Sequence, residues 1–161
     1  MGIALDTRTG TPIVVLNDQE NRRALPIWIG TAEASAIIRQ LEGIKSARPM
    51  THDLLFNALE LTGYQVTRVE INDINEDTYY ASIYLTHPNG DQHIVDARPS
   101  DAIALALKAN VPIFATTQVV AEGTISTDED RDEAEAAEFR EFLSDLKASD
   151  FKFPNDLESN Q

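Results

Sequence analysis

Two arginines stand directly before prolines, and each of these loops leads into a stretch with helical periodicity. Arg48 precedes Pro49, and Arg98 precedes Pro99. Because proline disfavours the α conformation in the residue before it, both arginines are expected on extended backbone at a helix start. The free N–H groups of a helix N-terminus and the planar guanidinium of arginine both bind anions. Arg48 and Arg98 are therefore candidate phosphate-binding residues.

The alternative interpretation of the two arginine loops is structural. Acidic residues lie close to both loops in the sequence, namely Asp53, Asp96 and Asp101. Salt bridges from these acids to the arginines would lock the loops in place and leave no cationic group free for a ligand. The spacing alone does not decide between an anion cradle and a pair of locks.

A histidine next to a carboxylate is the second candidate feature. His52 can act as a general base or as a metal ligand, because histidine titrates near neutral pH. Asp53 follows it, but neighbouring residues on a helix point about 100° apart, so the two need not act on the same atom. A histidine at a helix start is also commonly a capping or surface residue. His87 and His93 flank a predicted turn and are expected to face solvent.

Carboxylates near these loops could hold a divalent cation. They are Glu33, Asp53, Asp96 and Asp101. Hydrolysis of a phosphodiester commonly uses Mg²⁺ or Mn²⁺ held by a few carboxylates. Asp96 ends a predicted strand and Asp101 opens the next helix, so both could reach one ion, together with Asp53 or Glu33. For each acid taken singly, capping of a helix N-terminus is the competing interpretation.

Strand and helix signals alternate along residues 1–125. Strands are predicted at 3–6, 13–16, 25–30, 66–71, 79–86, 93–95 and 112–115. Helices are predicted after the caps Thr31 and Thr51 and from Ser100 to about Lys108, with Gly43 and Gly63 ending the first two. Several strands are joined by hairpins, so the predicted class is α+β, with helices packed on a mixed or antiparallel sheet. Ala-Arg-Pro occurs before two of these helices, which indicates a duplicated strand–loop–helix unit.

The composition excludes several classes of protein. The 161 residues contain 27 Asp and Glu against 13 Lys and Arg, a net charge of −14, and no cysteine. Disulfide scaffolds, zinc ribbons and thiol nucleophiles are thereby excluded. The acidity argues against a protein that binds nucleic acid through a broad basic face, and is also typical of adaptation to high salt. No apolar run approaches the roughly 20 residues that span a bilayer, so a cytoplasmic protein without a membrane partner is expected.

The acidity is concentrated beyond residue 125. Residues 1–125 carry a net charge of −6 and residues 126–161 one of −8, which predicts one domain followed by an acidic extension. The extension contains an amphipathic pattern over about residues 129–147 and then a tail expected to be flexible. Its apolar residues 139–146, together with Ile27-Trp28-Ile29, offer more apolar surface than a small core needs. A homo-oligomer is therefore expected.

Three stretches of the sequence resemble the bifunctional nuclease family. They are Leu25-Pro26-Ile27-Trp28-Ile29-Gly30 with Glu33-Ala34, then Arg48-Pro49-Met50-Thr51-His52-Asp53-Leu54, and then Val95-Asp96-Ala97-Arg98-Pro99-Ser100-Asp101-Ala102-Ile103-Ala104-Leu105-Ala106. The resemblance covers about residues 3–122. It implies an α+β fold and metal-assisted cleavage of both DNA and RNA with little sequence preference, nucleic acid being a substrate rather than a stable ligand.

Under that function the candidate residues take definite roles by their chemistry. His52, Asp53 and Asp101 are the expected catalytic residues, Arg48 and Arg98 bind phosphate, and Asp96, Asp101, Asp53 and Glu33 are the expected metal ligands. The rival hypothesis is a non-enzymatic oligomeric module that binds a partner or a small anion. It requires the arginines and aspartates to be buried and mutually paired with no cleft beside them. The catalytic hypothesis requires them to line a pocket with His52.

Overall fold

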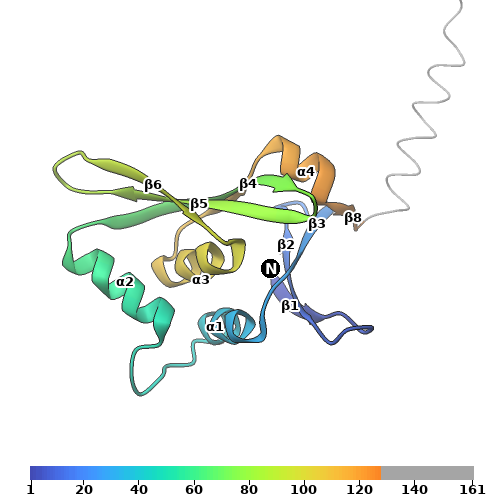
Figure 1. Cartoon of the computed structure of the whole chain (residues 1–161), viewed down its shortest axis with the longest axis horizontal. Coiled ribbons are helices and arrows are strands. Elements are labelled where there is room, and N and C mark those ends of the chain that lie inside the picture. The colour runs from blue at the N-terminus through green and yellow to red at the C-terminus, as the bar shows by residue number, and fades with distance from the viewer. Residues whose placement is uncertain (128–161) are drawn as a thin grey trace, which may run out of the picture. The chain divides into compact units, whose positions relative to one another are not determined.

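The computed structural model describes residues 1–127, which form two four-stranded sheets and four helices (Figure 1). The strands are β1 Gly2–Leu5, β2 Pro12–Asn17, β3 Arg23–Trp28, β4 Gln65–Asn75, β5 Thr78–Thr86, β6 Gln92–Ala97, β7 Ile113–Ala115 and β8 Ile125–Ser126. The helices are α1 Thr31–Leu41, α2 Thr51–Leu61, α3 Pro99–Ala109 and α4 Thr117–Gly123. The predicted α+β class is therefore confirmed. The predicted helix at 129–147 and the tail lie outside the described residues.

The first sheet has the order β1-β2-β3-β8, and β1, β2 and β3 are joined as antiparallel neighbours. The register of β2 and β3 places Val14 opposite Ile27, and both side chains are buried in the core. Ile29 is also buried, whereas Trp28 remains 53% exposed. The expectation that Ile27 and Ile29 supply an oligomer surface is therefore wrong, because strand alternation directs them into the core of their own domain.

The second sheet has the order β6-β5-β4-β7, with β7 parallel to β4 and the other neighbours antiparallel. β4 runs to Asn75, four residues beyond the predicted end, because the hairpin with β5 continues through a register shift after Ile71. The hairpin turns at Glu76 and Asp77, both with positive φ angles. The predicted turn at Gly90 is present, with φ +96°.

α3 is the central helix of the domain and packs against α1, β4 and β5. Five consecutive side chains from Ala102 to Ala106 are buried, three of them alanines that allow close approach on every side. α2 differs, because none of its residues is buried; its broad apolar face is only partly covered. Phe56 and Leu59 pack against the core, while Leu61 is 88% exposed.

The structure places the starts of two helices one residue earlier than the sequence predicted. The N-caps of α1 and α2 are Gly30 and Met50 rather than Thr31 and Thr51, since the carboxylate of Asp53 accepts a hydrogen bond from the backbone N–H of Met50 (2.9 Å). α4 and β8 were not predicted. The duplicated unit is present only as an Arg-Pro loop and a helix, because no strand precedes Arg48. None of the described helices combines the length and apolar character needed to cross a bilayer.

Candidate active site

Four of the predicted site residues form one chain of polar contacts at the N-termini of α1, α2 and α3. The Nε2 atom of His52 lies 3.0 Å from Oδ1 of Asp101. Arg98 donates to the same carboxylate from Nε (2.7 Å) and Nη2 (3.1 Å). Its Nη1 atom lies 3.0 Å from Oε1 of Glu33. Residues that are up to 68 positions apart in the sequence thus meet where three helices begin, because α3 packs against both α1 and α2.

Room for this arrangement depends on Gly30, the N-cap of α1. A Cβ atom at that position would overlap the carboxylate of Glu33, which folds back over the helix start. Glycine therefore lets Glu33 reach Arg98 from the first turn of its own helix.

The charges of the cluster are stabilised by each other. Burial raises the pKa of Asp101, but hydrogen bonds from Arg98 and His52 outweigh it, and the pKa of Asp101 is lowered overall. The pKa of Arg98 is raised, first by its bonds to Asp101 and then by Glu33. Asp101 is therefore a carboxylate and Arg98 a cation at neutral pH. The Arg98 side chain is 66% exposed and that of Asp101 29%, so solvent reaches the pair.

Asp53 takes part in a separate contact. Its Oδ1 atom accepts from Nζ of Lys108 at 2.7 Å, and its Oδ2 from the backbone of Met50. The pKa of Asp53 is lowered, first by the hydrogen bond from Lys108 and then by that from Met50. His52 and Asp53 thus contact different partners, as their adjacent helix positions predicted, and Asp53 fastens the start of α2 to the end of α3.

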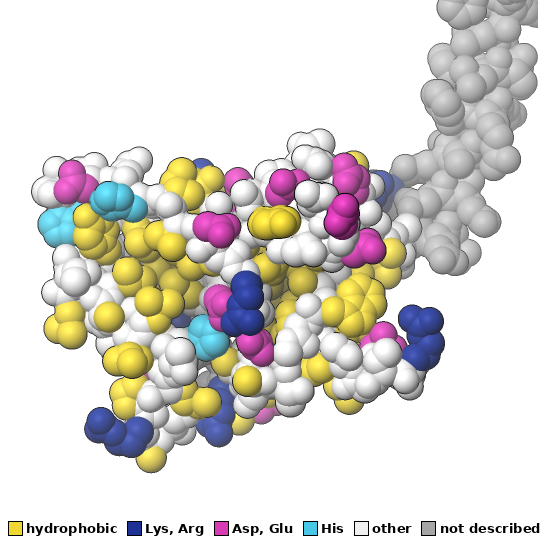
Figure 2. Space-filling view, viewed as in Figure 1, with side chains coloured by type: hydrophobic (Ala, Val, Ile, Leu, Met, Phe, Trp, Pro, Cys, Tyr) yellow, Lys and Arg dark blue, Asp and Glu magenta, His cyan; other side chains and the backbone are white. Residues whose placement is uncertain are grey.

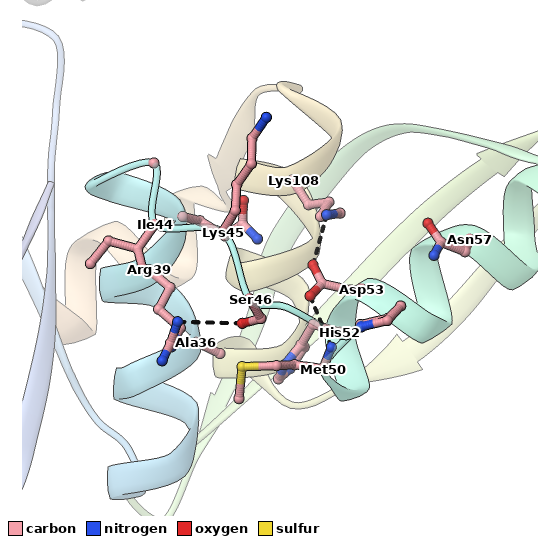
Figure 3. A pocket seen from close by; sticks show the side chains of 13 residues that line it. Ala36, Arg39, Ile44, Lys45, Ser46, Met50, His52, Asp53, Asn57 and Lys108 are labelled. Atoms are coloured by element: carbon pink, nitrogen blue, oxygen red, sulfur yellow. Dashed lines mark hydrogen bonds and ion pairs between the residues drawn. The ribbon is translucent and has the colours of Figure 1, made fainter.

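A cavity of about 380 Å³ opens beside these contacts, between α1, the loop before α2, and the end of α3 (Figure 3). Its lining includes three cationic side chains, Arg39, Lys45 and Lys108, together with His52; Asp53 is the acidic residue of the lining. Figure 3 shows Lys108 and Asp53 pointing toward one another and Arg39 toward Ser46, whose hydroxyl it reaches at 3.3 Å. Both lysines of residues 1–127 therefore line one cavity.

Two of the predicted residues lie apart from this cluster. Arg48 is exposed and forms no hydrogen bond or ion pair with residues 1–127. Asp96 is exposed on the edge strand β6, opposite Ser82, and likewise has no polar partner in the described part of the chain. The loop arginines were predicted from the same local pattern, but only Arg98 has carboxylates beside it, Asp101 from its own helix and Glu33 from α1.

The expected metal ligands do not gather into a binding cluster. Among residues 1–127 no three His, Asp or Glu side chains are placed to hold one ion. Asp101 and Glu33 are both bonded to Arg98, and Asp53 to Lys108, so protein cations occupy the positions next to these carboxylates. The described arrangement therefore does not fit the Mg²⁺ or Mn²⁺ site expected from Asp96, Asp101, Asp53 and Glu33.

The geometry shares features with both hypotheses. Arg98, Asp101 and Glu33 are mutually paired, as a structural lock requires. Arg98 is nevertheless largely exposed, and His52 lines an open cavity, as a catalytic role requires. Figure 2 shows acidic, basic and histidine side chains gathered in the middle of one face, next to apolar surface.

The cations of the cavity were missed from the sequence. Arg39 and Lys108 lie in the last turns of α1 and α3, where basic residues are favoured by the helix dipole alone, so neither stood out. Lys45 lies in a loop without a motif. The one available signal was that lysine is rare in this part of the sequence, with only two lysines before residue 128.

Comparison with known proteins shows which family the chain resembles. The family model of the bifunctional nuclease domain matches residues 14–128. An uncharacterized protein of Mycobacterium tuberculosis (strain ATCC 25618 / H37Rv) is 37% identical over 161 residues, covering 94% of this chain and 95% of that protein. Bifunctional nuclease 1 of Oryza sativa subsp. japonica is 29% identical over 103 residues, covering 63% of this chain and 31% of the rice protein. Bifunctional nuclease 2 of Arabidopsis thaliana is 29% identical over 91 residues, covering 55% of this chain and 28% of that protein. The resemblance carried by the three sequence motifs is confirmed, and the chain belongs to the bifunctional nuclease domain family.

Proposed function

We propose that this protein is a nuclease that hydrolyses phosphodiester bonds in DNA and RNA, with His52 as the group that moves protons. The observation that carries the proposal is the hydrogen bond from His52 to Asp101 at the wall of a cavity lined by Arg39, Lys45 and Lys108. An oriented histidine in a cavity lined by cations is a combination that suits phosphoryl chemistry.

The contact with Asp101 assigns a role to each ring nitrogen of His52. Neutral histidine donates from Nε2 to the carboxylate, which leaves Nδ1 with a free electron pair. Nδ1 can then accept a proton from an attacking water or, in RNA, from a 2′-hydroxyl. The carboxylate of Asp101 holds the ring in place and stabilises the imidazolium that forms, which is the role of the carboxylate in a catalytic triad.

The cations of the cavity supply the charge that the rest of the protein lacks. Residues 1–125 carry a net charge of −6, so a polyanion is repelled by most of the surface. Lys45, Lys108 and Arg39 all line this cavity, although Lys108 is paired with Asp53, and from there they can bind the phosphate and stabilise charge that develops on it. Contacts to phosphate carry no sequence information, which accords with little sequence preference.

The relatives support the same activity. Both plant proteins named bifunctional nucleases align with part of this chain, although that alignment spans about a third of each plant protein. The described side chains do not form the ligand cluster expected for Mg²⁺ or Mn²⁺, so the roles proposed for His52 and Asp101 involve no metal ion.

The test is cleavage of single-stranded DNA and of RNA by the purified full chain, with Mg²⁺, with Mn²⁺ and with EDTA. We expect His52→Ala to lower cleavage to a small residual rate and Lys45→Ala to weaken it. His93→Ala is the matched control, because His93 contacts Tyr64 and does not line the cavity. Equal cleavage by the wild type and His52→Ala would show that the activity comes from a contaminant or from another site.

A second candidate function is supported by the pairing of Arg98 with Asp101 and Glu33. In a module that binds a small anion without chemistry, these contacts would only hold the three helix starts together. Such a module binds oligonucleotide or inorganic phosphate in the cationic cavity and leaves every phosphodiester intact. Binding that depends on Lys45 and Lys108, with no cleavage under any metal condition, would favour it.

A further inference from the structure

A second cavity lies on the other side of Arg98. Its volume is about 440 Å³, within the range of small-molecule sites. Arg98 and Ser100 at the start of α3 line it, together with Trp28 at the end of β3 and Tyr79 of β5. The two cavities are connected by hydrogen bonds: Arg98 contacts Asp101, and Asp101 contacts His52, which lines the first cavity.

The chemistry of this second cavity differs from that of the first. Its lining contains one cation, Arg98, and one acid, Asp77, and is otherwise uncharged. Trp28 is 53% exposed there, although Ile27 and Ile29 on either side of it are buried. The indole is held in position because its Nε1–H donates to Asp6 at 3.1 Å, and Asp6 is itself fixed by the backbone N–H of Arg8 at 2.9 Å. A flat aromatic surface is thus kept rigid and open to solvent.

Ser100 is the second unusual group of this cavity. The residue as a whole is only 5% exposed. Its hydroxyl forms no hydrogen bond within residues 1–127, and its oxygen is not among the enclosed side-chain atoms that lack a partner, so the hydroxyl stays open to the cavity. Since Ser100 lines the cavity, a ligand placed there can supply the missing partner.

We propose that this second cavity is a nucleobase subsite, in which an unpaired base stacks on Trp28 and contacts the hydroxyl of Ser100. The inference rests on the proposed nuclease function, because it assigns the phosphate next to that base to Arg98 and the cationic cavity. An uncharged aromatic cavity suits a base, and the neighbouring cations suit a phosphate. Stacking tolerates every base, and the faces of bases within a duplex are already covered, so the substrate is single-stranded nucleic acid.

The chain contains a single tryptophan, so its fluorescence reports on the subsite directly. The full chain carrying His52→Ala, which slows cleavage, is titrated with a short oligothymidylate, with an abasic oligomer of equal length and with inorganic phosphate. Only the oligothymidylate is expected to quench Trp28. Quenching by the abasic oligomer to the same extent would overturn the inference. So would emission that changes with protein concentration and not with oligonucleotide, which would mean that a second copy covers Trp28.

The contribution of each residue to affinity is measured as the dissociation constant of a labelled oligothymidylate for each variant. Trp28→Ala is expected to raise the dissociation constant about 5- to 150-fold, from the usual contribution of base stacking, and Trp28→Phe to retain most of the affinity. Tyr80→Ala is the matched control, since Tyr80 is exposed on β5 but does not line the cavity. Ser100→Ala leaves Trp28 in place and is expected to weaken binding about 2- to 10-fold. Circular dichroism checks that each variant is folded.

The outcomes separate this inference from the nuclease proposal. His52-dependent cleavage with equal affinities for Trp28→Ala and Tyr80→Ala would retain the nuclease and remove the base subsite. Binding that requires both the bases and Trp28, without any cleavage, would retain the subsite and remove the nuclease.

Discussion

Replacing Asp101 by asparagine removes the negative charge that both His52 and Arg98 contact. Asparagine has nearly the same shape, and its Oδ1 atom can still accept the bond from His52. Asparagine cannot balance the charge of Arg98 or of a protonated His52, and its NH2 group cannot accept the bond that Arg98 Nε donates to Oδ2 of Asp101. The substitution therefore tests whether Asp101 acts on His52 through its charge or only by accepting a hydrogen bond.

The effect on stability is expected to be modest. Asp101 accepts three hydrogen bonds at 2.7–3.1 Å, and bonds to charged groups contribute about 1.5–3 kcal/mol each when they are well shielded. Arg98 is 66% exposed, however, and exposed ion pairs contribute only about 0–1 kcal/mol. We expect Asp101→Asn to lower the free energy of unfolding by about 1–2 kcal/mol, measured by urea denaturation at neutral pH.

The effect on catalysis is expected to be much larger. If Asp101 orients His52 and stabilises the imidazolium, Asp101→Asn should lower kcat about 10²- to 10⁴-fold and change KM little. Replacing the aspartate of a catalytic triad by asparagine has an effect of that size. The assay is steady-state cleavage of a fluorogenic single-stranded oligonucleotide. Glu60→Gln is the matched control, because Glu60 is exposed on α2 and lies outside the cavity lining.

A double-mutant cycle with His52→Ala decides whether the two residues act as a unit. Residues in one catalytic series are strongly non-additive, so Asp101→Asn should cost almost nothing once His52 is absent. Additive losses in kcat, or full activity in a folded Asp101→Asn variant, would refute the assigned role of Asp101.

Four further outcomes follow from the structure. Lys45→Ala and Lys108→Ala should each lower the salt dependence of oligonucleotide binding by about 0.7 in the slope of log K against log salt, and an unchanged slope would place the phosphate elsewhere. Because folding lowers the pKa of Asp53, its ionised carboxylate stabilises the fold above the ordinary carboxyl range, and this stabilisation is lost as the pH falls below about 4 and through the lowered pKa. In Asp53→Asn the free energy of unfolding, measured by urea denaturation at a series of pH values, should fall less steeply on acidification. Ile103 is fully buried, so Ile103→Ala should cost about 2–5 kcal/mol in the same denaturation assay, and a loss below 1 kcal/mol would contradict close packing around α3. Light scattering should detect a homo-oligomer that Leu61→Lys weakens, because α2 exposes much of its apolar face; a monomer at all concentrations would contradict it.

Local signals in the sequence were sufficient for most of the fold. α3 follows from the Arg-Pro loop before it and from the apolar run to about Lys108, and the structure adds that Asn110, in the left-handed conformation, ends it. β5 follows from strict alternation. α4 was missed because seven residues are too few to establish a helical period, although Thr116 does cap it by accepting from the backbone of Val119.

The site was predictable only in part, for a physical reason. Proline fixed the local conformation of Arg98, so its place at a helix start could be inferred. The contacts of His52 with Asp101 and of Asp53 with Lys108 join residues 49 and 55 positions apart, and they depend on how α2 lies across α3. Side-chain periodicity indicates which face of a helix is apolar but not the direction in which two helices cross. The same limit hid the fact that Lys45, Arg39 and Lys108 line one cavity.

The attachment of α2 to α3 has a consequence for the motion of the site. Asp101 and Lys108 are seven residues apart, two turns of α3, or about 10 Å along its axis, and they contact the adjacent residues His52 and Asp53. Since no residue of α2 is fully buried, these two polar contacts add to the partial packing of Phe56 and Leu59 in holding it. α2 should therefore open locally without unfolding the domain, and its amide hydrogens should exchange with solvent faster than those of α3. Ionic strength and acidity then govern the fraction of time that the imidazole spends at the cavity wall.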